Sequence, residues 1–252
     1  SGKSTADYEA VFQSLKNLCA ERNCIRVDRV VADFEAAVWC AVKNVLKVEV
    51  KWCLFHFTQA VWRKIAWLKL KNDYHANLGT RIFCRKLMAL PMLPYNHISQ
   101  VFDKITELPL NKELQDLVSY MKKTWIDSSV FCPQSWSWFE EPIRTNNDVE
   151  RWHRRLITRA KKANLPFYRL IELLAHEASN DAYNLILVAN GQMTRKVSAK
   201  SCARQYHLEK LWEKYADNLI TPDQLLMHVY ESVEVDHNRE SQLVVPFEED
   251  DQ

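Results

Sequence analysis

Hydrophobic and polar residues follow two different periods along this chain, and the period changes near residue 58. Residues 24–33 alternate and then become apolar up to Asp33, which predicts a short buried strand. Residues 48–55 also alternate and carry β-branched and aromatic side chains, which predicts a second strand. Helical spacing over 6–19 and 35–46 surrounds the first strand. This order predicts two parallel strands joined by a helical crossover.

Beyond residue 58 the period is helical, and prolines separate the segments. The predicted helices are 60–70, 80–90, 98–108, 112–123, 147–163, 167–190, 201–217 and 222–232. A tryptophan-rich connector fills 125–142, and the acidic tail 236–252 is predicted to be disordered. The fold class is therefore α/β and mostly α. Two strands do not make a stable sheet, so we expect an upstream segment or a partner to complete it.

Composition narrows the function classes only slightly. The chain has 252 residues and a formal net charge of +2, so overall charge does not indicate a nucleic-acid partner. Nine tryptophans and only three glycines disfavour glycine-rich phosphate loops and a turn-rich all-β fold. Seven irregularly spaced cysteines are typical of reduced thiols rather than a disulfide framework. No apolar run is long enough to span a bilayer, so no membrane partner is expected.

Two carboxylates stand at positions that suit a divalent metal. Asp33 follows the first predicted strand, at the edge where open α/β sheets build their sites. Glu150 lies at the predicted start of helix 147–163. If the fold brings them together, they form a metal site. The alternatives are an N-cap role for Asp33 and a helix-dipole role for Glu150.

Two further groups carry candidate chemistry. Cys53 and His56 form a Cys-x2-His pair at the end of the second strand, but a zinc finger needs two more ligands at regular spacing. We therefore expect no structural zinc; a buried thiol beside a partly exposed histidine is the alternative. A basic stretch over 144–169, interleaved with aromatic residues, is suited to phosphate contact and base stacking. A solvated amphipathic helix explains that stretch almost as well.

Four stretches together resemble the transposase domain of Mutator-like elements over roughly residues 1–160. They are Gly2-Lys3-Ser4 followed by Tyr8, Asp33-Phe34-Glu35-Ala36-Ala37, Cys53-Leu54-Phe55-His56-Phe57-Thr58-Gln59-Ala60, and Arg144-Thr145-Asn146-Asn147-Asp148-Val149-Glu150-Arg151-Trp152-His153. Their order and spacing match that family, and the ordered combination is far more specific than any single stretch.

The resemblance implies an incomplete RNase H-like core with an Asp-Asp-Glu site, a large all-helical insertion and a helical C-terminal region. Asp33 matches the second aspartate and Glu150 the glutamate, and both would bind Mg²⁺ or Mn²⁺. The implied domains are a partial core over 1–57, an insertion over 58–143, a Glu-bearing helical region over 144–235, and the tail 236–252.

In the family the first catalytic aspartate lies on a strand upstream of the Gly-Lys-Ser segment. The chain is therefore expected to be a fragment or remnant of a DNA-cleaving and strand-transferring enzyme, inactive alone. The alternative is a domesticated, non-catalytic DNA- or protein-binding protein. The resemblance further implies transposon-end DNA as partner and a nuclear location, and it leaves the oligomeric state open, a homo-oligomer included. The residues expected to contact DNA or support the site are Cys53, His56, Arg144, Asn146, Asn147, His153, Arg154 and Arg155.

Overall fold

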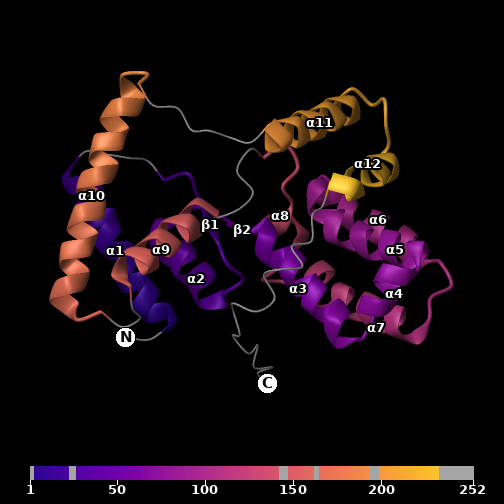
Figure 1. The fold of residues 1–252 in the computed structure, drawn as a ribbon. Coiled ribbons are helices and arrows are strands. Elements are labelled where there is room, and N and C mark those ends of the chain that lie inside the picture. The colour runs from indigo at the N-terminus through magenta and orange to yellow at the C-terminus, as the bar shows by residue number, and fades with distance from the viewer. Residues whose placement is uncertain (1–2, 23–26, 142–146, 162–164, 193–198, 233–252) are drawn as a thin grey trace. The chain divides into compact units, whose positions relative to one another are not determined.

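The computed structural model describes residues 3–22, 27–141, 147–161, 165–192 and 199–232. Most of these residues are helical, and the strands found among them form one parallel pair (Figure 1), which confirms the mostly-α α/β class. The chain divides into two compact units, residues 1–144 with 210–252 and residues 145–209. The predicted tail 236–252 lies outside the described residues.

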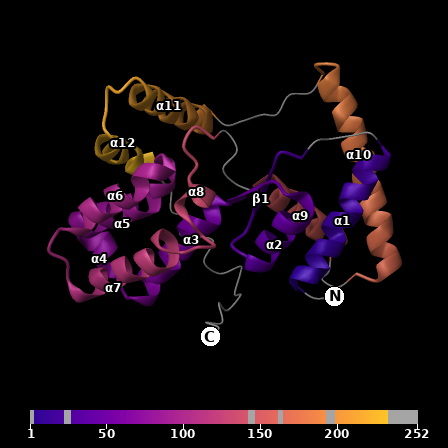
Figure 2. The same cartoon turned by 180° about the vertical axis from the view of Figure 1, so that it is seen from behind.

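The sheet pairs β1 (Arg29–Ala32) with β2 (Glu49–Trp52) in parallel, with Arg29 opposite Glu49 and Ala32 opposite Trp52. The crossover between them is α2 (Ala36–Ala41) followed by a π-helical turn over Val42–Leu46. Lys47 ends this turn in the left-handed conformation, at φ 57°. α1 (Thr5–Glu21) packs along the crossover, as Figures 1 and 2 show from opposite sides.

The remaining helices of the first unit come from the predicted insertion and the C-terminal region. They are α3 (Leu54–Trp67), α4 (Lys71–Ala76), α5 (Leu78–Ala89), α6 (Tyr95–Thr106), α7 (Lys112–Met121), α8 (Pro133–Trp136), the last part of α11 (Ala199–Ala216) and α12 (Pro222–Val229), with short turns at Leu90–Met92, Lys122–Ile126 and Tyr230–Ser232. Across the fully described range 58–123 there is no strand, as predicted. Asn77, Asn111 and Thr221 accept backbone N–H groups at the starts of α5, α7 and α12.

An aromatic core joins β2 to the tryptophan-rich connector. Trp52, Trp136 and Trp138 are fully buried, and the Nε1–H of Trp138 donates to the Trp52 carbonyl at 2.9 Å. The buried Lys51 ammonium donates to the carbonyls of Gln134 and Ser137, at 3.0 and 3.1 Å. The connector therefore fixes the end of β2 through polar and aromatic contacts together.

The second unit contains α9 (Asn147–Ala160), α10 (Phe167–Ala189) and the first part of α11 (Ala199–Ala216). Glu177 of α10 is only 1% exposed and pairs with two arginines of α9. Arg155 Nη2 lies 2.6 Å from one Glu177 oxygen, and Arg159 Nη1 pairs with the other. These contacts join the two helices.

Candidate metal centre at the ends of β1 and β2

The parallel register brings the residues after β1 and β2 side by side. Asp33 directly follows β1, and Cys53 directly follows β2. The Cys53 N–H donates to the Ala32 carbonyl at 2.8 Å, so the ladder continues one residue past β2. The carboxyl ends of both strands therefore present Asp33 and Cys53 at the same sheet edge.

The start of α3 adds His56 to this edge. Cys53 is the N-cap residue of α3, and His56 is the third residue of the helix. In a capping box, the side chain of the third helical residue reaches back across the first turn to the N-cap residue, so these two positions lie close together. A Cys-x2-His spacing at a helix start thus places the thiol and the imidazole together. The second strand was predicted to extend to residue 55, but β2 ends at Trp52 because α3 begins at Leu54.

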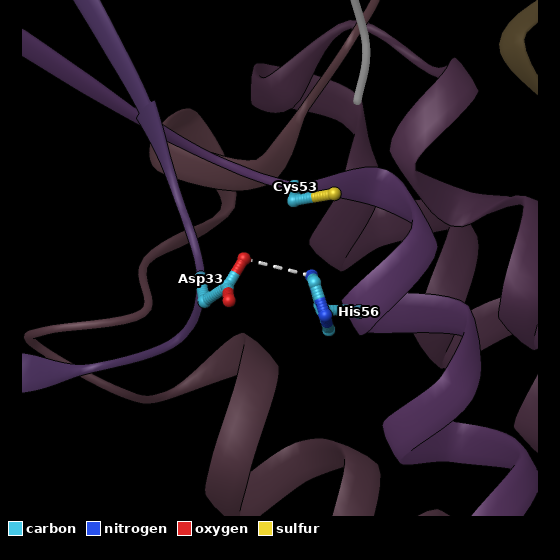
Figure 3. A group of neighbouring side chains, drawn as sticks. All are labelled: Asp33, Cys53 and His56. Atoms are coloured by element: carbon cyan, nitrogen blue, oxygen red, sulfur yellow. Dashed lines mark ion pairs between the residues drawn. The ribbon is translucent and has the colours of Figure 1, made fainter. Parts of the chain in front are cut away.

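The three side chains converge on a small region (Figure 3). His56 Nδ1 lies 2.9 Å from Asp33 Oδ1, and the ligand atoms of Asp33, Cys53 and His56 all lie within 4.8 Å of one another. Cys53 is fully buried, the His56 side chain is 18% exposed and the Asp33 side chain is 54% exposed. The cluster therefore runs from a buried sulfur to a solvent-facing carboxylate.

The environment of His56 favours its charged form. Burial of the ring lowers the pKa, but hydrogen bonding to Asp33 and to Cys53, with the charges of both, outweighs burial. The net effect raises the pKa of His56 from 6.5 to about 10. Without a metal, an imidazolium–carboxylate ion pair thus holds Asp33 and His56 together.

The structure contradicts the N-cap alternative for Asp33. The N-cap residue of α2 is Glu35, which makes no side-chain capping bond. Both Glu35 oxygens instead lie 3.1 Å from the Tyr8 hydroxyl of α1, which donates to them. Burial, followed by this hydrogen bond, raises the pKa of Tyr8. The turn after β1 is thus anchored through Glu35, and Asp33 points toward Cys53 and His56.

Several of the predicted site residues lie outside the described part of the chain. These are Arg144 and Asn146, together with the side chains of Asn147 and Glu150. The backbone of Glu150 belongs to α9. Because Asp33 and α9 belong to different units, the pairing of Asp33 with Glu150 remains a prediction.

The predicted DNA contacts in α9 differ in their surroundings. His153 and Arg154 are exposed. Arg155 is also exposed, but it pairs with Glu177 and lies 3.5 Å from Asp181. Glu177 and Asp181 of α10 therefore neutralise part of the positive charge on α9.

Sequence reasoning missed two features of these sites. It placed the Cys53–His56 pair beside the site only through the family resemblance and did not join it with Asp33 into one ligand set, although the predicted parallel strands already placed Asp33 and Cys53 at one edge. It also missed Glu177 as the partner of the α9 arginines. A glutamate within the largely apolar pattern of 167–190 was the available signal.

Comparison with known proteins adds no family assignment. No family profile, no curated protein and no solved structure matches this chain. Among the described helices, none combines the length and apolar character needed to cross a membrane.

Proposed function

We propose that this chain is a fragment or remnant of a Mutator-like DNA transposase, whose complete catalytic domain cleaves and joins DNA strands. The observation that carries the proposal is Asp33 at the carboxyl end of β1, directly beside Cys53 and His56. This is the neighbourhood that the resemblance implies for the second aspartate and the Cys-x2-His signature. In this proposal β1 and β2 belong to an RNase H-like core, and α3 opens the helical insertion.

The acidic residues would have distinct tasks in the complete site. Asp33 suits Mg²⁺ or Mn²⁺ because its carboxylate is half-exposed at the sheet edge, with room for water and phosphate oxygens. Glu150 would supply an oxygen ligand from α9, and the first aspartate of the family pattern would supply the third carboxylate. Ions held by these carboxylates would supply activation of the attacking oxygen and stabilisation of the leaving oxygen of a phosphodiester.

DNA contact is assigned to the exposed side of α9. His153 and Arg154 are available there to phosphate groups. Arg155 contributes less because Glu177 already holds its guanidinium. Phosphate contacts of this kind position DNA without reading its sequence, so the binding should weaken with salt.

The test is metal-dependent nicking of supercoiled plasmid. The chain is joined to the upstream strands of a Mutator-like transposase, so that a strand-borne first aspartate is supplied. We expect nicking in Mg²⁺ or Mn²⁺, and its loss in Asp33→Asn and in Glu150→Gln. The matched control is Asp116→Asn, which changes an exposed aspartate on α7.

The same assay separates the non-catalytic alternative. Nicking that survives Asp33→Asn or Glu150→Gln contradicts the assignment of those carboxylates. DNA binding without nicking, in every metal tried, supports a domesticated binding protein instead.

A further inference from the structure

We propose that Asp33, Cys53 and His56 form a binding site for a divalent transition metal of the zinc class, with three protein ligands and a fourth position open to solvent. The proposal goes beyond the Mg²⁺ or Mn²⁺ site of the proposed enzyme. It also departs from the expectation of no structural zinc, because that expectation counted only ligands spaced along the sequence.

The donor set selects the class of metal. A thiolate, an imidazole and a carboxylate are the three ligand types that Zn²⁺ takes in proteins. Mg²⁺ and Ca²⁺ are bound through oxygen and leave sulfur unused. Cys53 thus contributes nothing to a magnesium site but is a strong ligand for zinc or cobalt.

The geometry of the cluster requires only small adjustments to hold such an ion. In a tetrahedral site with bonds of about 2.0–2.3 Å, neighbouring ligand atoms lie roughly 3.3–3.8 Å apart. The three ligand atoms lie within 4.8 Å of one another, and the His56–Asp33 separation is 2.9 Å. Side-chain rotations that move the ligand atoms by about 1 Å bring these separations into the tetrahedral range.

The backbone holds the ligands in place before any metal arrives. The hydrogen bond from Cys53 N–H to the Ala32 carbonyl fixes Cys53 beside the end of β1. The Phe57 N–H donates to the Cys53 carbonyl at 3.1 Å, which fixes the first turn of α3 and with it His56. Asp33 is the most exposed of the three, so its side chain has the most freedom to adjust.

The burial gradient supplies an entry path and an open position. An ion reaches the cluster past the half-exposed Asp33 carboxylate and meets the buried Cys53 sulfur last. Water can complete the coordination on the solvent side, as in zinc sites with three protein ligands. Binding releases the thiol and imidazole protons to solvent.

Cobalt provides a direct test, because a Co²⁺–thiolate bond produces a charge-transfer absorption that Mg²⁺ and unbound Co²⁺ lack. The reduced, metal-free chain is titrated with Co²⁺, without DNA or Mg²⁺. We expect this absorption to saturate at one Co²⁺ per chain and to disappear when Zn²⁺ is added. A titration without thiolate absorption overturns the proposal, whatever the outcome of the nicking assay.

Three substitutions assign the ligands. Cys53→Ser should abolish the thiolate absorption. His56→Gln and Asp33→Asn should each weaken Co²⁺ binding at least about tenfold, because removing a residue that only hydrogen-bonds to a metal ligand already has an effect of that size. Cys202→Ser removes an exposed cysteine outside the cluster and should leave the titration unchanged.

Circular dichroism of each variant serves as the control that its helices are retained. Asp33→Asn keeps the proposal testable if a buried substitution fails to fold, because the Asp33 side chain is half-exposed. Unchanged cobalt affinity in a folded Asp33→Asn chain, or thiolate absorption that survives Cys53→Ser, contradicts this ligand set.

Discussion

Replacing Trp138 with phenylalanine tests whether the connector holds the end of β2 in place. The Trp138 indole is fully buried, and its N–H donates to the carbonyl of Trp52, the last residue of β2 and the neighbour of Cys53. Phenylalanine keeps an aromatic ring but removes this donor. The change therefore acts directly on the backbone that carries Cys53.

The expected cost has two parts. Loss of the donor to a buried carbonyl costs about 1–3 kcal/mol. The smaller ring leaves a cavity that costs about 1 kcal/mol more. Together they lower the free energy of unfolding by about 2–4 kcal/mol. Trp67→Phe is the matched control, because Trp67 is 72% exposed and its loss should change stability by no more than about 0.5 kcal/mol.

Urea denaturation followed by far-ultraviolet circular dichroism measures both variants. Both tryptophans lie in the first unit, so they report on the same part of the molecule. We expect a lower urea midpoint for Trp138→Phe, with an unchanged slope, and no shift for Trp67→Phe. Equal midpoints for the two variants refute the role assigned to the connector.

Three further outcomes follow from the contacts described above. Glu177→Gln releases both Arg155 and Arg159 from their ion pairs with this residue, so affinity for random duplex DNA should rise and the salt dependence should steepen by about one to two charges, measured by fluorescence anisotropy over a range of salt; an unchanged slope contradicts this. At neutral pH a thiol reagent should label exposed Cys202 but not Cys84, because burial raises the pKa of Cys84 to about 12; peptide mapping that finds Cys84 labelled first contradicts it. If nicking is obtained, Zn²⁺ should inhibit it by occupying Asp33, and Cys53→Ser should relieve that inhibition. Equal inhibition of the unsubstituted protein and of its Cys53→Ser variant contradicts the use of Asp33 by both metal sites.

The sheet edge was predictable because local patterns determine it. The apolar run before Asp33 predicts a strand that ends there, and the parallel order of elements places the next strand beside it. The separation of Cys53 and His56 matches one turn at a helix start. These features depend on neighbouring residues, which a single sequence displays.

Contacts between distant residues were not predictable in the same way. The connector is visibly rich in tryptophan, but its bond from Trp138 to Trp52 joins residues 86 positions apart. The anchoring of Glu35 by Tyr8 likewise depends on how α1 packs along the crossover. Glu177 resembles any helical glutamate until α9 places two arginines against it. Such pairings depend on tertiary packing and leave little trace in local periodicity.

The proposed function requires that Asp33 and Glu150 belong to the same metal site. Anomalous diffraction from crystals of the chain grown with Mn²⁺ measures this directly. We expect an anomalous peak within bonding distance of both carboxylates. Carboxylates more than about 10 Å apart would contradict it, because the ions of a two-metal site lie only about 4 Å from each other.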